Sequence, residues 1–173
     1  MNTIDKHPLI VGFGNASEFI FEKINIDKYG IYTIINSNFH NTTDKIQYIK
    51  TNNTMLSKDA KQFFKANNNF VLFCAIGGET GGRLLLETVK FLSKYNKNYT
   101  VICSFPFSFE GEKRKQRAQD SLEKLLHYTD ISLISQEVLR LNKPDLSITQ
   151  AFDLVGARIR EVSDKIMSNL WNL

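Results

Sequence analysis

The chain has 173 residues, of which 42% are hydrophobic and 23% charged, and its formal net charge is +4 at pH 7. These values suit one globular domain with its own core, spanning residues 1–173. No apolar run approaches the roughly 18 residues of a membrane span, so no membrane partner is expected. The first residues are polar, so no signal peptide is expected. Basic residues are not interleaved with aromatic ones, so no nucleic-acid partner is expected.

The first predicted element is a buried strand over residues 9–14 that runs into a tight turn. Gly12 and Gly14, followed by Ser17, nearly match the dinucleotide-binding fingerprint. That fingerprint also needs an acidic residue about 20 positions later to hold a ribose hydroxyl. The second predicted strand, residues 31–35, instead ends in Asn36-Ser37-Asn38. A nicotinamide or flavin site is therefore not expected.

A short strand and a helix are predicted next. Residues 45–50 favour an edge strand because of their lysines, and residues 57–66 favour a helix. Ser57 is expected to cap that helix, with Phe63 and Phe64 facing the core.

The stretch from Asn69 to Arg114 carries the strongest functional signal. Residues 70–76 predict a strand, Gly77-Gly78-Glu79-Thr80-Gly81-Gly82 a turn, and residues 83–92 a helix. This order points backbone N–H groups and a helix N-terminus at an anion. A further strand, residues 99–105, leads into Pro-Phe-Ser-Phe-Glu-Gly-Glu-Lys-Arg at residues 106–114. We interpret this stretch as half of a nucleotide site.

The cysteines and histidines do not suggest a metal centre. Cys74 and Cys103 fall within predicted strands and are expected to be buried free thiols, as in a reducing cytosol, so we expect a cytoplasmic protein. His7, His40 and His127 have no ligand partners at metal spacing, so no zinc site is predicted.

The remaining elements complete an α/β fold. A helix is expected from Ser108 or Glu110 to about Tyr128, with Ala118, Leu122, Leu125 and Leu126 on its apolar face, and a strand at residues 131–134. Ser147 and Gln150 form a capping box that opens a long helix over residues 147–170. The order predicts a three-layer α/β sandwich with a mostly parallel, doubly wound sheet of five or six strands, closed by this C-terminal helix.

The glycine-rich turn and the phrase at residues 106–114 together resemble FtsZ, the bacterial cell-division relative of tubulin, over its nucleotide-binding domain only. The resemblance implies GTP or GDP, with or without Mg²⁺, as ligand, and self-association or association with a full-length FtsZ. It also implies that Glu110 bonds a ribose hydroxyl, that Arg114 reaches the phosphates, that Phe152 stacks on guanine and that Gln136 takes the place of an amide holding the nucleoside. The candidate nucleotide-binding residues are Gly12, Gly14, Asn15, Asn36, Gly77, Gly78, Thr80, Gly81, Gly82, Arg83, Glu110, Arg114, Gln136 and Phe152; no catalytic residue and no metal ligand is nominated.

Several positions depart from the family pattern. Asn15 and Ala16 replace glycines of the first turn, Glu79 and Arg83 replace glycines of the second, and Gly156 replaces the residue that reads the guanine edge. The glycine-rich loop around the terminal phosphate is missing. Glu79 could pair with Arg83, four residues on, or point into solvent; the sequence leaves both open.

The resemblance leaves two leading hypotheses for function. One is a minimal guanine-nucleotide-binding module linked to cell division or filament assembly, with weak or no GTP hydrolysis, because the family's activating loop beyond the long helix is not in the sequence. The other is a degenerate interaction protein, a pseudo-GTPase without nucleotide, in which Glu79 or Arg83 fills the phosphate position. An α/β enzyme acting on another phosphorylated small molecule is a third reading.

Overall fold

The computed structural model describes residues 8–23, 32–38, 46–141 and 145–171. Its elements in chain order are β1 (Leu9–Phe13), α1 (Asn15–Lys23), β2 (Tyr32–Asn36), β3 (Ile46–Lys50), α2 (Lys58–Ala66), β4 (Asn69–Ala75), α3 (Gly81–Lys94), β5 (Asn98–Phe105), the 3₁₀ turn η3 (Ser108–Glu110), α4 (Glu112–Leu126), β6 (Ile131–Ser135), α5 (Gln136–Leu141) and α6 (Ile148–Trp171).

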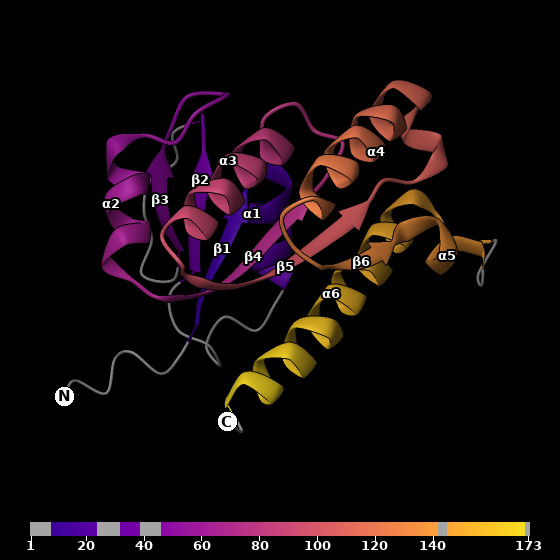
Figure 1. The fold of residues 1–173 in the computed structure, drawn as a ribbon. Helices are drawn as coiled ribbons and strands as arrows, with labels where there is room; N and C mark the ends of the chain where they lie inside the picture. Colours follow the sequence, from indigo (N-terminus) through magenta and orange to yellow (C-terminus); the bar gives the residue numbers. More distant parts are fainter. Residues whose placement is uncertain (1–7, 24–31, 39–45, 142–144, 172–173) are drawn as a thin grey trace.

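The six strands form one parallel sheet in the order β3-β2-β1-β4-β5-β6 (Figure 1). The chain moves outward from β1 to β3, then returns to the centre and moves the other way from β4 to β6. The direction of winding therefore reverses between β1 and β4, which is where open α/β sheets place their ligand crevice. The predicted doubly wound, parallel sheet is confirmed, with six strands.

Two apolar layers hold helices against the two faces of this sheet. Along β4, Leu72 and Cys74 join the cluster under α2, α3 and α4, whereas Val71 and Phe73 join the cluster under α1 and α6. This alternation follows from the two-residue period of a strand, and burial on both faces explains why β4 reads as a continuous apolar run. The three layers predicted from the sequence are present.

Local capping signals position the helices as expected. Ser57 precedes α2 and its Oγ accepts the N–H of Ala60 at 3.2 Å. Before α6, the Gln150 N–H donates to Ser147 Oγ at 3.3 Å and the Ser147 N–H donates to Gln150 Oε1 at 2.9 Å. Both predicted caps are confirmed, and β3 occupies the predicted edge position. Among the described residues, no helix combines the length and apolar character needed to cross a membrane.

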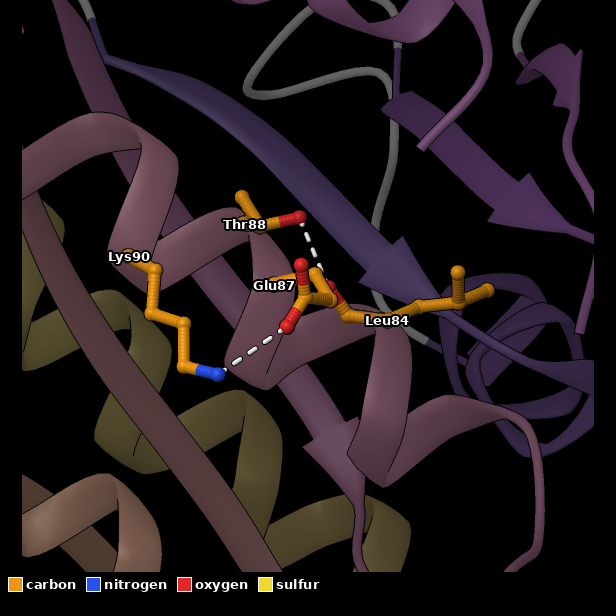
Figure 2. A network of polar contacts seen from close by, with 4 residues as sticks. All are labelled: Leu84, Glu87, Thr88 and Lys90. Carbon is orange, nitrogen blue, oxygen red and sulfur yellow. Dashed lines mark hydrogen bonds and ion pairs between the residues drawn. The ribbon is translucent and has the colours of Figure 1, made fainter. Parts of the chain in front are cut away.

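Helix α3 satisfies its one buried hydroxyl internally. Thr88 is fully buried against the sheet, and its Oγ1 donates to the carbonyl oxygen of Leu84 at 2.8 Å. Figure 2 shows this bond beside the ion pair between Lys90 Nζ and Glu87 Oε1, at 3.1 Å on the solvent side of the same helix. Because the hydroxyl has a partner, its burial carries little penalty and α3 packs tightly over the sheet.

Two expectations for the region after β5 are wrong, and one helix there was not predicted. The helix expected to start at Ser108 or Glu110 is interrupted at Gly111, whose φ of +98° is incompatible with a helix, so η3 and α4 are separate. Helix α5 was not predicted, because its six residues are too few to show a helical period. Leu126 is 55% exposed and does not join the core, since α4 ends there.

Adjacent leucines at the end of α4 offer a matched test of this packing. Leu125 is fully buried, and Leu125→Ala should lower the free energy of unfolding by about 2–5 kcal/mol, because it removes contacts and leaves a cavity. Leu126→Ala should change it by less than about 1 kcal/mol. Urea denaturation followed by circular dichroism measures both, and equal losses would contradict the placement of α4.

Candidate functional site

The turns that follow β1, β2 and β4 meet at the carboxyl edge of the sheet and enclose a pocket of about 270 Å³. We call it the switch-point pocket, because it lies where the winding of the sheet reverses. Its lining residues are Phe13, Gly14, Asn15, Ala16, Asn36, Ser37, Asn38, Ala75, Gly78, Glu79, Thr80, Gly81 and Arg114. It therefore unites both predicted glycine-containing turns with the amides that end β2.

The two turns are packed backbone against backbone. A Cβ on Gly81 would lie 2.9 Å from the carbonyl oxygen of Phe13 and 3.1 Å from the sulfur of Cys74, and a Cβ on Gly14 would lie 3.3 Å from the Cα of Gly81. Gly14 also has a φ of +78°, and its N–H donates to the carbonyl oxygen of Ile35 at 3.2 Å. Glycine is required at both positions, for contact distance at Gly81 and for conformation at Gly14.

The N-terminus of α3 opens onto the pocket without a side-chain cap. Thr80 is the N-cap residue, and its hydroxyl makes no capping hydrogen bond. The first N–H groups of any α-helix have no acceptor within the helix, and together with the helix dipole they favour an anion. Gly78, just before, also lines the pocket, and a Cβ there would meet nothing within 4 Å. The floor of the pocket thus presents backbone to an anionic ligand.

Arg114 supplies positive charge to the pocket and forms an ion pair with Glu110, which lies outside the pocket lining. Its Nε lies 3.1 Å from Glu110 Oε2, as an ion pair whose N–H is not aligned for a hydrogen bond. The other oxygen, Oε1, accepts the N–H of Phe107 at 2.9 Å, and the Glu110 side chain is only 12% exposed. Gly77, at φ +107°, makes room for this start of α4, because a Cβ there would lie 2.9 Å from the carbonyl oxygen of Arg114. In this arrangement Glu110 orients Arg114 and does not itself line the pocket.

Glu79 is neutralised by a residue that the sequence did not point to. Its Oε1 lies 2.7 Å from Arg117 Nη1 on α4, although the Glu79 side chain is 71% exposed. The pairing with Arg83 is therefore not formed, whereas the alternative that Glu79 points into solvent agrees with its exposure, although its Oε1 also contacts Arg117. Arg83 is exposed on α3 and is not part of the pocket lining. The contact joins residues that are 38 positions apart in the chain, so no local signal in the sequence identified Arg117.

Asn15 connects the first turn to the end of β2. Its Oδ1 accepts Nδ2 of Asn36 at 2.5 Å and Nδ2 of Asn38 at 3.2 Å, while Asn36 Oδ1 accepts the N–H of Ser37 at 2.8 Å. These contacts do not use the N–H donors of Asn15. Side-chain hydrogen bonds thus join the first turn to the end of β2, at a position where the resemblance led us to expect glycine.

The candidate residues divide by position. Seven candidates line the pocket: Gly14, Asn15, Asn36, Gly78, Thr80, Gly81 and Arg114. Four others are not in its lining and pack against neighbouring elements: Gly12, Gly77, Gly82 and Glu110. Arg83 lies apart from the pocket. Gly12 lies under α1, 2.5 Å from Ser17 Cβ if given a Cβ, and Gly82 lies under Ser121 of α4. The side chains of Gln136 and Phe152 are outside the described residues.

The buried cysteine beneath the pocket is not a nucleophile. Burial raises the pKa of the Cys74 thiol well above its ordinary value, and the neighbouring Cys103 raises it further. Burial also raises the pKa of Cys103 to about 12, and both cysteines are free. Since the thiolate is the reactive form, these groups are inert near neutral pH. No cluster of three metal-ligating side chains occurs within the described parts of the chain.

Comparison with known proteins identifies relatives for part of the chain. No family model matches it. It is 30% identical over 116 residues to the mitochondrial division protein fszB of Dictyostelium discoideum, covering 65% of this chain and 31% of that protein. It is 29% identical over 98 residues to the cell division protein FtsZ of Methanothermobacter thermautotrophicus, covering 54% and 26%. The matched stretch thus spans about a third or less of each curated relative.

Solved structures extend the match over most of the fold. FtsZ from M. jannaschii aligns with a TM-score of 0.77 at 17% identity, covering 95% of this chain and 57% of that one. The GDP-bound monomer of CetZ1 from Haloferax volcanii aligns with a TM-score of 0.65 at 16% identity, covering 90% and 58%. The fold is therefore FtsZ/tubulin-like and corresponds to the N-terminal GTPase domain of those proteins, as the resemblance in the sequence indicated.

Two neighbouring glycines test the close packing at the pocket. Gly81→Ala should lower the free energy of unfolding by about 1–3 kcal/mol, because its Cβ would press on the Phe13 carbonyl oxygen and on Cys74. Gly78→Ala, whose Cβ would have open space, should change it by less than about 0.5 kcal/mol. Urea denaturation of both variants measures the difference, and a tolerated Gly81→Ala would contradict the close approach.

The raised thiol pKa values predict alkaline destabilisation. An unfolded thiol ionises near pH 8.5, whereas Cys103 in the fold has a pKa of about 12, so as pH rises the unfolded state loses its proton first and stability falls across that window. Between pH 8 and 10 the loss from this thiol should be about 2 kcal/mol. Urea midpoints at the two pH values measure it, and Cys103→Ala should remove that part of the pH dependence, while an unchanged dependence would contradict the assignment.

Proposed function

We propose that this chain is an FtsZ/tubulin-like module that binds a guanine nucleotide, GDP or GTP, with its phosphates in the switch-point pocket, and that it acts in filament assembly or cell division. The observation that carries the proposal is the open pocket at the winding reversal, with an uncapped helix N-terminus on one side and Arg114 on the other. Backbone N–H groups and a guanidinium are the donors that recognise phosphate in proteins.

The size of the pocket supports phosphate binding there, with the nucleoside outside. Ligand pockets usually enclose about 300–1,000 Å³, and 270 Å³ lies just below that range, so in this proposal the pocket holds the phosphates and the nucleoside lies beyond it. The nucleoside would then extend past Arg114, toward the segments that carry Gln136 and Phe152. By resemblance these two residues, together with Glu110, contact the base and the ribose.

Paired charges at the pocket support a diphosphate or a cation-bound polyphosphate. Arg114 and Glu79 both line it, and each is paired outside the pocket, with Glu110 and Arg117 respectively. An unpaired Glu79 would repel phosphate by about 1 kcal/mol or more, and Arg117 reduces that repulsion. Glu79 and Thr80 offer oxygen atoms of the kind that Mg²⁺ accepts, and Mg²⁺, when bound, neutralises phosphate oxygens.

We further propose that the chain alone hydrolyses GTP weakly or not at all. Phosphoryl transfer to water needs a group that positions the attacking water. Among the described residues that line the pocket, Glu79 is the carboxylate, and its Oε1 is engaged by Arg117. An engaged, solvent-exposed carboxylate is poorly placed for that role.

A second candidate function is an interaction protein that has lost its nucleotide. The hydrogen bonds of Asn15 to Asn36 and Asn38 favour it, because side chains there occupy space that glycines leave free. In this alternative, self-association or association with a full-length FtsZ would proceed without GDP or GTP.

A pair of neighbouring substitutions tests the phosphate contact. Isothermal titration calorimetry should detect GDP binding, and Arg114→Gln should weaken it about tenfold, or about 1.4 kcal/mol, because a charge-assisted contact to phosphate is lost. Lys113→Gln removes the same charge from an exposed neighbour on the same helix and should change affinity less than twofold. Equal effects of the two variants would place the phosphates elsewhere.

Nucleotide carried through purification separates the two functions. Heating the purified protein should release GDP or GTP, identified by chromatography and by absorbance at 260 nm. The absence of released nucleotide, combined with no heat of binding up to millimolar GDP or GTP, would overturn the proposal and support the interaction protein.

A further inference from the structure

We propose that the chain forms a two-fold symmetric dimer through strand β6, which pairs antiparallel with the same strand of a second copy. The inference begins with the sheet order. β6 pairs with β5 on one side and is the last strand of the sheet, opposite β3 (Figure 1). A last strand presents a row of backbone N–H and C=O groups that another strand can pair with.

The two edges of the sheet differ in how they resist such pairing. β3 carries an exposed Gln47 and ends in an exposed Lys50, and a charged residue is a common device against edge-to-edge contact. β6 reads Ile-Ser-Leu-Ile-Ser and holds no charged residue. The edge at β6 is thus the one whose own side chains permit a partner strand.

Exposed apolar side chains surround this edge. Leu133 in the middle of β6 is 45% exposed, and Val138 and Leu141 on α5 are 55% and 68% exposed. Beside them a groove of about 710 Å³ runs between β6 and α6, and its lining includes Leu133, Val138, Leu154 and Ala157. Exposed apolar side chains beside a groove with a polar rim are features that protein interfaces share.

The charges on the rim point to a second copy as the occupant. Arg158 and Glu161 of α6 line the groove and pair with each other, with Nη1 and Oε2 2.6 Å apart. Among the described residues that line the groove, the charged ones are this cation and this anion, so their charges cancel and give no advantage to a strongly acidic or basic partner. Under a two-fold rotation, however, each charge can face its opposite on the other copy, so the rim is complementary to itself.

The length of β6 also fixes a register. A two-fold axis perpendicular to the sheet makes the two edge strands antiparallel. For the five residues Ile131–Ser135, full overlap places Leu133 opposite the partner's Leu133. Directly opposed residues have Cβ atoms about 4.5–5.5 Å apart, so the exposed leucines would cover one another. The switch-point pocket lies between β1 and β4, beyond β5 from this edge, and stays open in the dimer.

Sedimentation velocity from 1 to 100 µM protein tests the dimer directly. We expect a species of about twice the 19.9 kDa chain mass, and Leu133→Lys should weaken dimerisation at least 100-fold by placing two like charges opposite each other. Met55→Lys, at a 59% exposed position before α2, makes the same kind of change away from β6 and should leave the dimer intact. A protein that stays monomeric at 100 µM, or a dimer that survives Leu133→Lys, would overturn the proposal.

Oxidative cross-linking tests the strand register in a way that does not depend on the stability of the Leu133→Lys variant. Leu133→Cys should form an intermolecular disulfide under mild oxidation, seen as a dimer on a non-reducing gel, while Met55→Cys should not. The native Cys74 and Cys103 are buried and will not contribute. Equal cross-linking of the two variants, or oligomers that grow only with GTP, would show that another surface mediates association.

Discussion

The contact between Gly81 and the carbonyl oxygen of Phe13 sets the geometry of the site. β1 and β4 are neighbours in the sheet, with Phe13 beside Cys74, and α3 must begin directly above them. Gly81 has no side chain, so the first turn of α3 rests on the end of β1, where a Cβ would lie 2.9 Å from the oxygen. A bulkier residue would push the N-terminus of α3 outward and separate its N–H groups from the amides of the first turn. The depth of the pocket is therefore a consequence of backbone packing, and the exposed side chains around it only adjust its charge.

The charges around the pocket matter more for ligands than for stability. In the pair of Glu79 and Arg117 the carboxylate is largely exposed and the guanidinium partly so, and solvent-screened pairs of this kind contribute roughly 0–1 kcal/mol to folding. In the proposed phosphate site, however, the same pair reduces a negative charge that would oppose phosphate. Glu110, by contrast, pairs with Arg114 from a far more buried position and orients the guanidinium. Helix α4 thus supplies both arginines of the site: Arg114 lines the pocket, and Arg117 pairs with Glu79 of the second turn.

The sequence predicted the architecture because its apolar runs and glycine turns are local signals. Six strands, the caps at Ser57 and Ser147 and the meeting of two turns all follow from such signals. The partner of Glu79 could not be predicted in that way, because Arg117 lies 38 residues away and approaches only through the packing of α3 on α4. The same holds for Asn15 and Asn36, which are 21 residues apart. At Gly111 a positive φ separates η3 from α4, and the glycine alone did not indicate that break, because a single glycine is also tolerated inside a helix.

Symmetry distinguishes the proposed dimer from a filament. Antiparallel pairing of β6 reverses the direction of the sheet in the second copy, so the two switch-point pockets would face opposite ends of a continuous sheet. A head-to-tail assembly keeps every copy in the same direction and can grow without limit. In a two-fold interface the same surface of both copies is buried, so the assembly stops at a dimer. A chain that dimerises through β6 therefore needs a separate surface to polymerise, and the carboxyl edge of the sheet, where the nucleotide is proposed to bind, remains free to supply it.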